Sequence, residues 1–257
     1  MFAATVWEFR AVQATIPGGR VEQRAGKPLY VARLGAGECW VMQTGMGLQQ
    51  AAAGARALLG REPFVLSIST GFACALTSAH VGDVVAGTQV ESVEHQESAG
   101  SCRLEAGGLA RDRFMTVLRA WMQGGRGVEG LFVSVNRVVG RGGDKAALAR
   151  RTGAIGLDME SAALAGEATT AGVPFVIVRT VSDLRDEDLP LDFNLFLRPS
   201  GWARGIMTIV LHPGCLGGLM RLRRQSLVAA RNLSRCLESV LRQFLAELPG
   251  GQVPTGL

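Results

Sequence analysis

PFVIVRTVSD, residues 174–183, is the stretch of the sequence that decides the fold. Residues 174–181 form the most apolar strand-like segment of the chain, and a charged loop follows Asp183. A continuous apolar run of this length is typical of a strand buried on both faces, as in parallel sheets that helices cover. The stretch therefore predicts a central strand that stops at Ser182 and Asp183.

The segments on either side of this strand alternate between strand and helix patterns. A short strand at 155–157 leads through Asp158-Met159-Glu160 into a helix of small residues that ends near Ala171. Further strands are expected at 2–6, 39–44, 64–69, 84–90 and 131–135, and further helices at 48–59, 110–122 and 144–151. This alternation predicts an α/β fold, a three-layer αβα sandwich around a central mixed, largely parallel twisted sheet.

The composition is that of a globular protein. The 257 residues are 47% hydrophobic and 19% charged, which excludes a disordered chain and suits one large domain. The five cysteines and three histidines are scattered and lack metal-ligand spacing, so we expect free thiols, no metal and a cytoplasmic setting. The longest apolar run, 205–220, is shorter than the ~20 residues of a spanning helix, so we expect no transmembrane segment.

The positive charge is concentrated at the C-terminal end. Seven arginines and two glutamates lie from residue 200 onward, so this part carries +5, as does the whole chain, and the rest sums to zero. We therefore expect no nucleic-acid partner for the body. Apolar residues at helical spacing predict an amphipathic helix over 216–248. This helix either packs on the core or on another subunit, or makes peripheral contact with the inner face of an anionic membrane.

Polar or glycine-containing segments follow five of the expected strands. They are Glu8, Gly45-Met46-Gly47, Thr70-Gly71, Met159-Glu160 and Ser182-Asp183. Ligand sites of open α/β sheets lie beyond the carboxyl ends of strands, so these segments are candidates for one site. The glycine pair lacks the third glycine of a dinucleotide fingerprint, because Gln50 occupies that position, and is interpreted as a tight turn. Taken alone, Asp183 fits a helix N-cap or a turn equally well, and Glu160 fits the start of a helix.

The order of these motifs resembles that of the nucleoside phosphorylase and nucleosidase superfamily. The likeness covers residues 1–196 and includes QTGMG at 43–47, STGFACAL at 69–76, VGDVV at 81–85, MESAA at 159–163 and the strand 174–183. It implies a catalytic domain over 1–199, with 200–257 as a basic helical extension of the same domain. It also implies an enzyme that needs no cofactor.

The resemblance implies a role for each candidate residue. Asp183, beside Ser182, looks like the acid that protonates the purine at N7, and Glu8 like the carboxylate that orients an attacking water. The residues expected to contact the substrate are Glu160 and Met159 at the ribose, Met46 at its 5′ side, Phe72 and Ala73 in the pocket wall, and Val138, Val139 and Phe193 around the base. These roles suit the chemistry, because cleavage of an N-glycosidic bond builds positive charge on ribose and negative charge on the base.

Two departures bear on the nucleophile and the substrate. Ser69 and Phe72 stand where phosphorylases of this superfamily hold phosphate, and neither is a cation, so water is the expected nucleophile. Phe72 and Cys74 also stand where the hydrolytic branch has small residues, which argues against methylthioadenosine as the substrate. The alternatives are a phosphorylase that uses Arg137 or Arg141, a non-catalytic nucleoside-binding module, and a membrane-surface protein.

The C-terminal segment is similar to that of the hopanoid-associated phosphorylase branch. The similarity lies in His212-Pro213-Gly214 and the helix rich in leucine and arginine that follows. It implies a purine nucleoside substrate such as adenosylhopane or another 5′-substituted adenosine. The oligomeric state is not defined by these patterns, and we expect a homodimer.

Overall fold

The computed structural model describes residues 1–35, 37–94, 97–103, 108–125, 127–197 and 214–247. The strands are β1 (Phe2–Ala3), β2 (Arg20–Arg24), β3 (Lys27–Leu34), β4 (Gly37–Gln43), β5 (Ser67–Ala75), β6 (Val84–Glu94), β7 (Glu97–Arg103), β8 (Gly127–Val135), β9 (Gly156–Asp158) and β10 (Phe175–Asp183). The helices are α1 (Val6–Gln13), α2 (Leu48–Leu59), α3 (Leu109–Gln123), α4 (Gly142–Thr152), α5 (Ser161–Thr170), the 3₁₀ helix η1 (Phe193–Leu197) and α7 (Cys215–Ala246).

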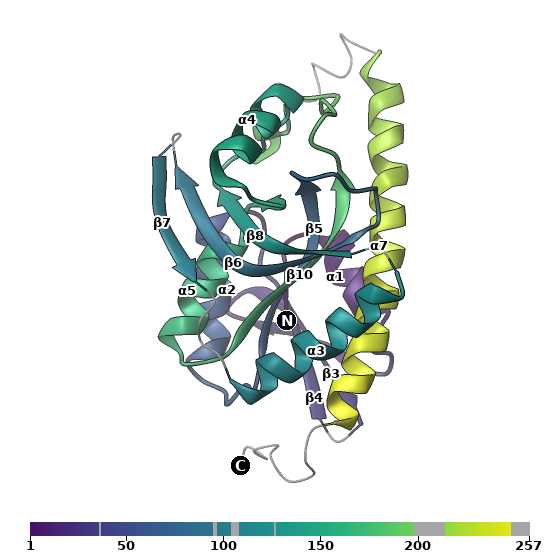
Figure 1. Ribbon diagram of the computed structural model, residues 1–257. Coiled ribbons are helices and arrows are strands. Elements are labelled where there is room, and N and C mark those ends of the chain that lie inside the picture. The colour runs from purple at the N-terminus through teal and green to yellow at the C-terminus, as the bar shows by residue number, and fades with distance from the viewer. Residues whose placement is uncertain (36, 95–96, 104–107, 126, 198–213, 248–257) are drawn as a thin grey trace.

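The strands form one twisted sheet that closes on itself in part (Figure 1). β10 pairs with both β5 and β6, β6 pairs with β8, and β9 joins β8 back to β5, which completes a ring. β1, β4, β3 and β2 extend the sheet from β5. Among the described strands, parallel and antiparallel pairings occur five times each. β10 therefore lies at the centre of the fold, as its apolar sequence predicts.

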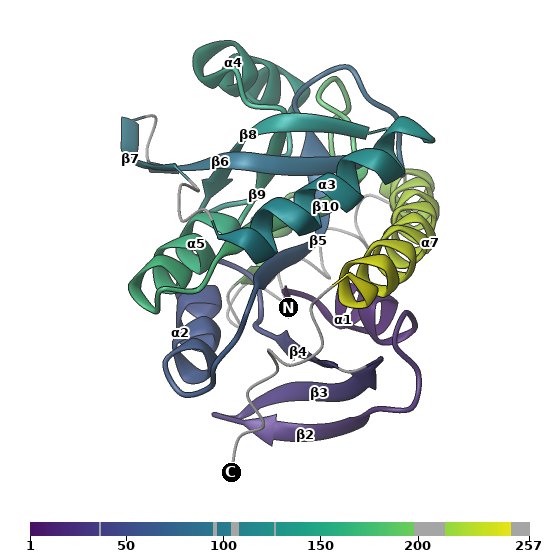
Figure 2. The same cartoon turned by 60° about the horizontal axis from the view of Figure 1, so that its bottom comes forward.

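Helices cover both faces of this sheet. α1, α3 and α7 pack on one face around a core that includes Phe9, Phe114 and Leu237. α2 and α5 pack on the other face around a core that includes Leu58 and Leu164. Figure 2 shows the sheet between these two groups of helices. The predicted three-layer αβα sandwich with a mixed sheet is confirmed.

Several predicted strand boundaries differ from the structure, and two of these differences affect the site. The expected strand at 64–69 begins at Ser67 and continues to Ala75, because parallel pairing with β10 extends to Cys74. Thr70 and Gly71 therefore lie within a strand, not at its end. The expected strand at 2–6 stops at Ala3, because Thr5 caps a helix that contains Glu8.

The C-terminal helix α7 packs on the body over part of its length. Its buried residues all lie in the later turns: Ala229, Leu233, Cys236, Leu237, Val240, Leu241 and Phe244. The turns before Ala229 contain no buried residue, and Leu216 and Met220 are about half exposed. The interpretation as a core-packing helix thus holds for the later turns. The expected helix end at Leu248 and most of the apolar run 205–220 lie outside the described residues. None of the described helices is long and apolar enough to span a membrane.

Candidate active site

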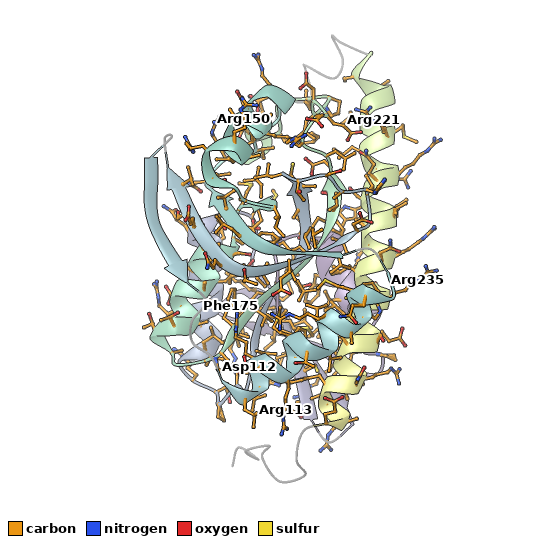
Figure 3. The ribbon with its side chains drawn as sticks, in the orientation of Figure 1. Asp112, Arg113, Arg150, Phe175, Arg221 and Arg235 are labelled. Atoms are coloured by element: carbon orange, nitrogen blue, oxygen red, sulfur yellow. The ribbon has the colours of Figure 1, made fainter. Side chains whose placement is uncertain are left out.

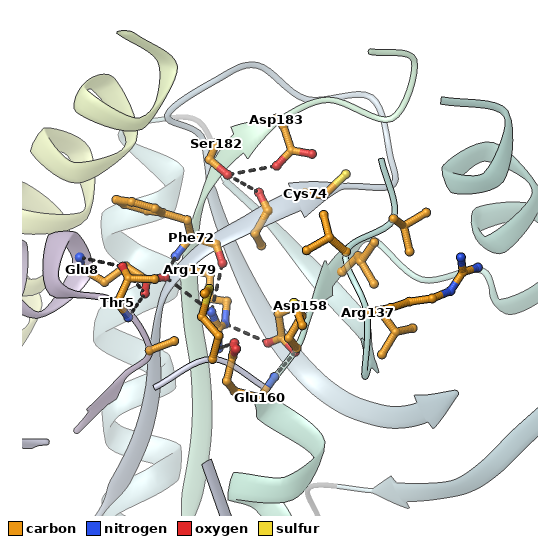
Figure 4. A pocket seen from close by; sticks show the side chains of 18 of the residues that line it. Thr5, Glu8, Phe72, Cys74, Arg137, Asp158, Glu160, Arg179, Ser182 and Asp183 are labelled. Atoms are coloured by element: carbon orange, nitrogen blue, oxygen red, sulfur yellow. Dashed lines mark hydrogen bonds and ion pairs between the residues drawn. The ribbon is translucent and has the colours of Figure 1, made fainter. Parts of the chain in front are cut away.

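One cavity at the carboxyl edge of β5 and β10 brings together most of the predicted site residues. Those that line it are Glu8, Met46, Phe72, Ala73, Val138, Val139, Met159, Glu160, Ser182 and Asp183. Figure 4 shows two polar groups around this cavity, with Ser182 and Asp183 on one side and Arg179 with its acidic neighbours on the other. These groups come from α1, the end of β9, the start of α5 and β10.

The first group is formed by the last two residues of β10. Asp183 keeps 15% of its side chain exposed, so its carboxylate is accessible from the cavity. Its Oδ1 accepts a hydrogen bond from Ser182 Oγ at 3.0 Å, and its Oδ2 accepts one from Lys145 Nζ at 2.7 Å. Asp183 is the last residue of a strand, so the interpretation as a helix N-cap is wrong, whereas a turn does follow it at 185–186. The two bonds hold one carboxylate at the cavity wall.

The second group surrounds the buried guanidinium of Arg179. Its Nε lies 2.8 Å from Asp158 Oδ2, its Nη2 lies 3.4 Å from Glu160 Oε2, and its Nη1 lies 3.9 Å from Glu8 Oε1. Arg179 also donates to Ser69 Oγ and to the Phe72 carbonyl, both at 2.9 Å. Three carboxylates thus share one guanidinium, so the cluster is acidic in spite of its arginine.

Glu160 is the carboxylate in this group whose charge is least compensated. Its Oε1 accepts a hydrogen bond from the backbone N–H of Gly47 at 3.0 Å, in a turn where Gly47 has a φ of 92°. Burial is the main cause that raises the pKa of Glu160 to about 7, and the charges of Asp158 and Glu8 contribute to the rise, although Arg179 opposes it. Glu160 therefore changes charge near neutral pH while it faces the cavity.

Glu8 has a structural role as well as a place in the cavity wall. It forms a capping box with Thr5, in which its Oε2 accepts from the Thr5 N–H at 2.7 Å and from the Thr5 hydroxyl at 2.8 Å. Its Oε1 accepts from the Phe72 N–H at 2.7 Å. Gly71 has a φ of 142°, and a Cβ there would meet the Glu8 carboxylate, so this approach requires glycine. Glu8 is thus held rigidly where α1 meets β5.

The remaining predicted residues divide between the cavity and its surroundings. Phe193 begins η1 and is not among the residues that line the cavity. The neighbouring residue Asn194 contacts the predicted base-pocket residue Val138. The Asn194 side chain accepts from the Val138 N–H at 2.8 Å and donates to the Val138 carbonyl at 2.9 Å. Arg137 lines the cavity and is exposed, whereas Arg141 is the N-cap residue of α4 and does not line it.

Three residues of the site were not identified from the sequence as candidates for chemistry. Arg179 had a signal, because an arginine within the most apolar strand requires a buried partner. Asp158 is such a partner, and it also organises the start of α5 by accepting from Ser134 Oγ at 2.5 Å and from the Ser161 N–H at 3.1 Å. Lys145 had no signal, because lysine in a short helix is ordinarily exposed.

Comparisons with known proteins agree with this architecture. The model of one family, the phosphorylase superfamily, matches residues 2–200. Similar solved structures include the 5′-methylthioadenosine/S-adenosylhomocysteine nucleosidase of Neisseria meningitidis in complex with methylthio-immucillin-A, at 20% identity and a TM-score of 0.72, covering 94% of this chain and 97% of that one. The S-adenosylhomocysteine nucleosidase of Streptococcus pyogenes in complex with 5-methylthiotubericidin has 21% identity and a TM-score of 0.71, with 96% and 95% covered. The nucleosidase of Colwellia psychrerythraea in complex with adenine has 19% identity and a TM-score of 0.71, with 95% and 93% covered.

Proposed function

Since the chain belongs to the phosphorylase superfamily, we propose that it cleaves the N-glycosidic bond of a purine nucleoside with water and releases the free base. The observation that carries this proposal is the arrangement of the cavity, which has a carboxylate beside a hydroxyl on one side and an acidic cluster on the other. Such a cavity opposes both charges that develop when the bond breaks. The three similar solved structures are described as nucleosidases, which is in keeping with this reaction.

Each side of the cavity has its own part in the proposed reaction. Asp183, oriented by Ser182, passes a proton to N7 of the purine, so that the base leaves as a neutral molecule. Glu160 binds the ribose hydroxyls, and its negative charge stabilises the positive charge that grows on the sugar. Met159, the residue before Glu160, packs beneath the sugar.

Water is the nucleophile that the cavity favours. The guanidinium of Arg179 is already shared by three carboxylates, so it offers little charge to a bound phosphate. The Ser69 hydroxyl is occupied by Arg179 and by Ser161 Oγ, which lies 2.8 Å away. Glu8 lines the same cavity and is the carboxylate to orient the water and accept its proton.

Phosphorolysis is the second candidate, and one observation favours it. Among the described residues that line the cavity, Arg137 is the other cation, and it takes part in no described ion pair with an acidic residue. An exposed arginine at the mouth of a cavity can recruit phosphate. The dependence of base release on phosphate separates the two reactions.

The proposed substrate is an adenosine with an apolar 5′ substituent, such as adenosylhopane. Met46, in the predicted 5′ position, lines the cavity and is 47% exposed. Val6 and Trp7 are also exposed, on the same helix as the lining residue Glu8. An exposed apolar side chain in the cavity wall, as at Met46, offers contact area to a hydrophobic substituent.

A panel of nucleosides tests the proposal. The purified protein is incubated with adenosine, inosine, methylthioadenosine and 5′-alkyl adenosines, with and without phosphate, and the free base is measured. We expect release without phosphate, fastest with the apolar 5′ groups. Release only with phosphate would replace hydrolysis by phosphorolysis, and no release from any purine nucleoside would contradict the proposed function.

A further inference from the structure

A lysine with no exposed surface contacts the carboxylate of Asp183. Lys145 belongs to α4, and its side chain is 0% exposed. It is not among the residues that line the cavity, whereas its partner Asp183 is one of them. Its ammonium donates to Asp183 Oδ2 at 2.7 Å, to the Glu187 carbonyl at 3.0 Å and to the Leu184 carbonyl at 3.2 Å. All three N–H bonds of the ammonium thus have an acceptor.

Such a lysine is unfavourable for stability alone. Burial of an ammonium costs several kcal/mol, and a buried ion pair often recovers no more than an apolar pair of similar size would supply. The turn after β10 also has other anchors on α4 and the residues before it. Asp188 Oδ1 accepts from the Gly142 N–H at 2.7 Å, and the Leu189 N–H donates to the Gly140 carbonyl at 2.7 Å. The turn therefore has anchors that do not involve Lys145.

The titratable groups next to the Lys145 ammonium are the ones with which it can exchange a proton. In the described part of the chain, Asp183 from β10 and Cys74 from β5 are its titratable neighbours. The other charged groups of the turn are engaged elsewhere, since Arg185 pairs with Asp186, Asp188 binds Gly142 and Glu187 binds Gln225.

The charges of this pair follow from its surroundings. Burial raises the pKa of the Cys74 thiol and the charge of Asp183 raises it further, so Cys74 stays neutral. Burial lowers the pKa of Lys145 and is the largest single influence, but the charges of Asp183 and Cys74 and the hydrogen bonds to them together outweigh it, so the net shift is upward. Lys145 and Asp183 form an ion pair, with 2.7 Å between Nζ and Oδ2, so a proton of the ammonium lies directly against the Asp183 carboxylate.

We propose that Lys145 is a positioning residue that stores the proton which Asp183 delivers to the leaving base; this inference rests on the proposed function. As the bond between ribose and base breaks, its electron pair moves onto the base. The negative charge that builds beside Asp183 draws a proton from the Lys145 ammonium onto the Asp183 carboxylate, and Asp183 passes a proton to the base. Lys145 is left as a neutral amine.

The remaining protons balance. Water adds its oxygen to the anomeric carbon of the ribose and gives a proton to Glu8. After the products leave, Glu8 returns that proton to solvent and Lys145 regains one from solvent. The net reaction is nucleoside and water to free base and ribose. The pair thus offers a transferable proton at pH values where an unpaired carboxyl would already have lost its own.

The test is the pH dependence of kcat in Lys145→Met, which keeps a chain of similar length without charge. The measured quantity is the ratio of wild-type to variant kcat from pH 5 to 9, because titrations common to both proteins cancel in it. We expect this ratio to grow with pH, from a few-fold at pH 5 to about 10²-fold or more at pH 8, the range of a lost general acid. A ratio that is constant across pH would mean a structural role and overturn the proposal.

Two further variants keep the test decisive. Lys145→Arg retains the positive charge but does not release its proton, so it should also lose base release at pH 8, and full activity would overturn the proposal. Asp188→Ala removes a different anchor of the same turn and should leave the pH dependence unchanged. If neither Lys145 variant folds, wild-type kcat decides, since a fall between pH 6 and 8 contradicts a proton stored on lysine. If the wild type releases no base at all, the proposed function fails, not the role of Lys145 alone.

Discussion

Asp183 and Glu160 face one cavity from two different strand ends, and each has its own set of charged and polar neighbours. Asp183 is held by Ser182 and by the buried ammonium of Lys145. Glu160 competes with Asp158 and Glu8 for a single guanidinium. Two carboxyl groups with separate environments are the usual basis of a division between acid and electrostatic roles.

Replacement of Asp183 by asparagine should slow base release by about 10²–10⁴-fold, because the amide cannot pass a proton to the base. Asparagine keeps an oxygen that can accept from Ser182, so the fold should persist. The check is the initial rate of base release alongside the circular dichroism spectrum. Normal turnover in a folded Asp183→Asn protein would remove Asp183 from the mechanism.

Glu160 gives the reaction a pH dependence of defined sign. Its pKa of about 7 means that it is neutral below pH 7 and a carboxylate above. Only the carboxylate stabilises a positive ribose, so kcat/KM of the wild type should rise as the pH increases through about 7. Glu160→Gln should lose this rise and show a kcat/KM lower by about 10²-fold at pH 8. An identical rise in the variant would assign the titration to another group.

At the scale of helices and strands, long apolar patterns in the sequence were sufficient to predict the elements. The predicted helix 48–59 has the observed bounds of α2, and the strand predicted at 174–181 is observed as β10, which begins one residue later and includes Ser182 and Asp183. The polar edge strand β2 was missed, because RVEQR has no buried face. α1 was missed although Thr5 and Glu8 have the spacing of a capping box.

The residues of the candidate site could be predicted from the sequence about as well as the helices and strands. The resemblance indicated eleven candidate site residues, and all of them but Phe193 line the cavity. Contacts between distant elements could not be predicted, because spacing along the chain does not encode them. The bond from Gly47 to Glu160 and the pair of Lys145 with Asp183 are of this kind.

α7 supplies a prediction about stability. Leu237 has no exposed surface and packs against the sheet-facing core, so Leu237→Ala should lower the free energy of unfolding by about 2–5 kcal/mol. Leu227, which is 38% exposed on the same helix, is the matched control, and Leu227→Ala should cost less than about 1 kcal/mol. Urea denaturation measures both values, and equal losses would contradict the described packing of α7.

At the scale of the whole molecule, part of the positive charge of the C-terminal segment lies on the early turns of α7, which contain no buried residue. Arg221, Arg223 and Arg224 are exposed, beside the exposed Leu216 and Met220. Figure 3 shows Arg221 and Arg235 at different points along the outer helix. Exposed arginines contribute about 1 kcal/mol each near an anionic membrane, so this segment suits the predicted peripheral contact. The homodimer likewise stays a prediction, which analytical ultracentrifugation would check.

The membrane prediction has a direct measurement. Wild-type protein should sediment with anionic liposomes at low salt and dissociate at high salt, because the attraction is screened over about 10 Å at 0.1 M. The variant with glutamine at 221, 223 and 224 should lose most of this binding. Wild-type protein that stays in the supernatant, or a variant that sediments equally, would leave α7 with a packing role only.

The central claim is that water attacks the ribose of a purine nucleoside in this cavity. The most direct measurement is the mass of the released sugar after reaction of a 5′-substituted adenosine in ¹⁸O-labelled water that also contains phosphate. The account predicts free adenine and a ribose derivative that carries one ¹⁸O at its anomeric carbon, at a rate that does not depend on phosphate. An unlabelled sugar 1-phosphate, formed only when phosphate is present, would contradict it.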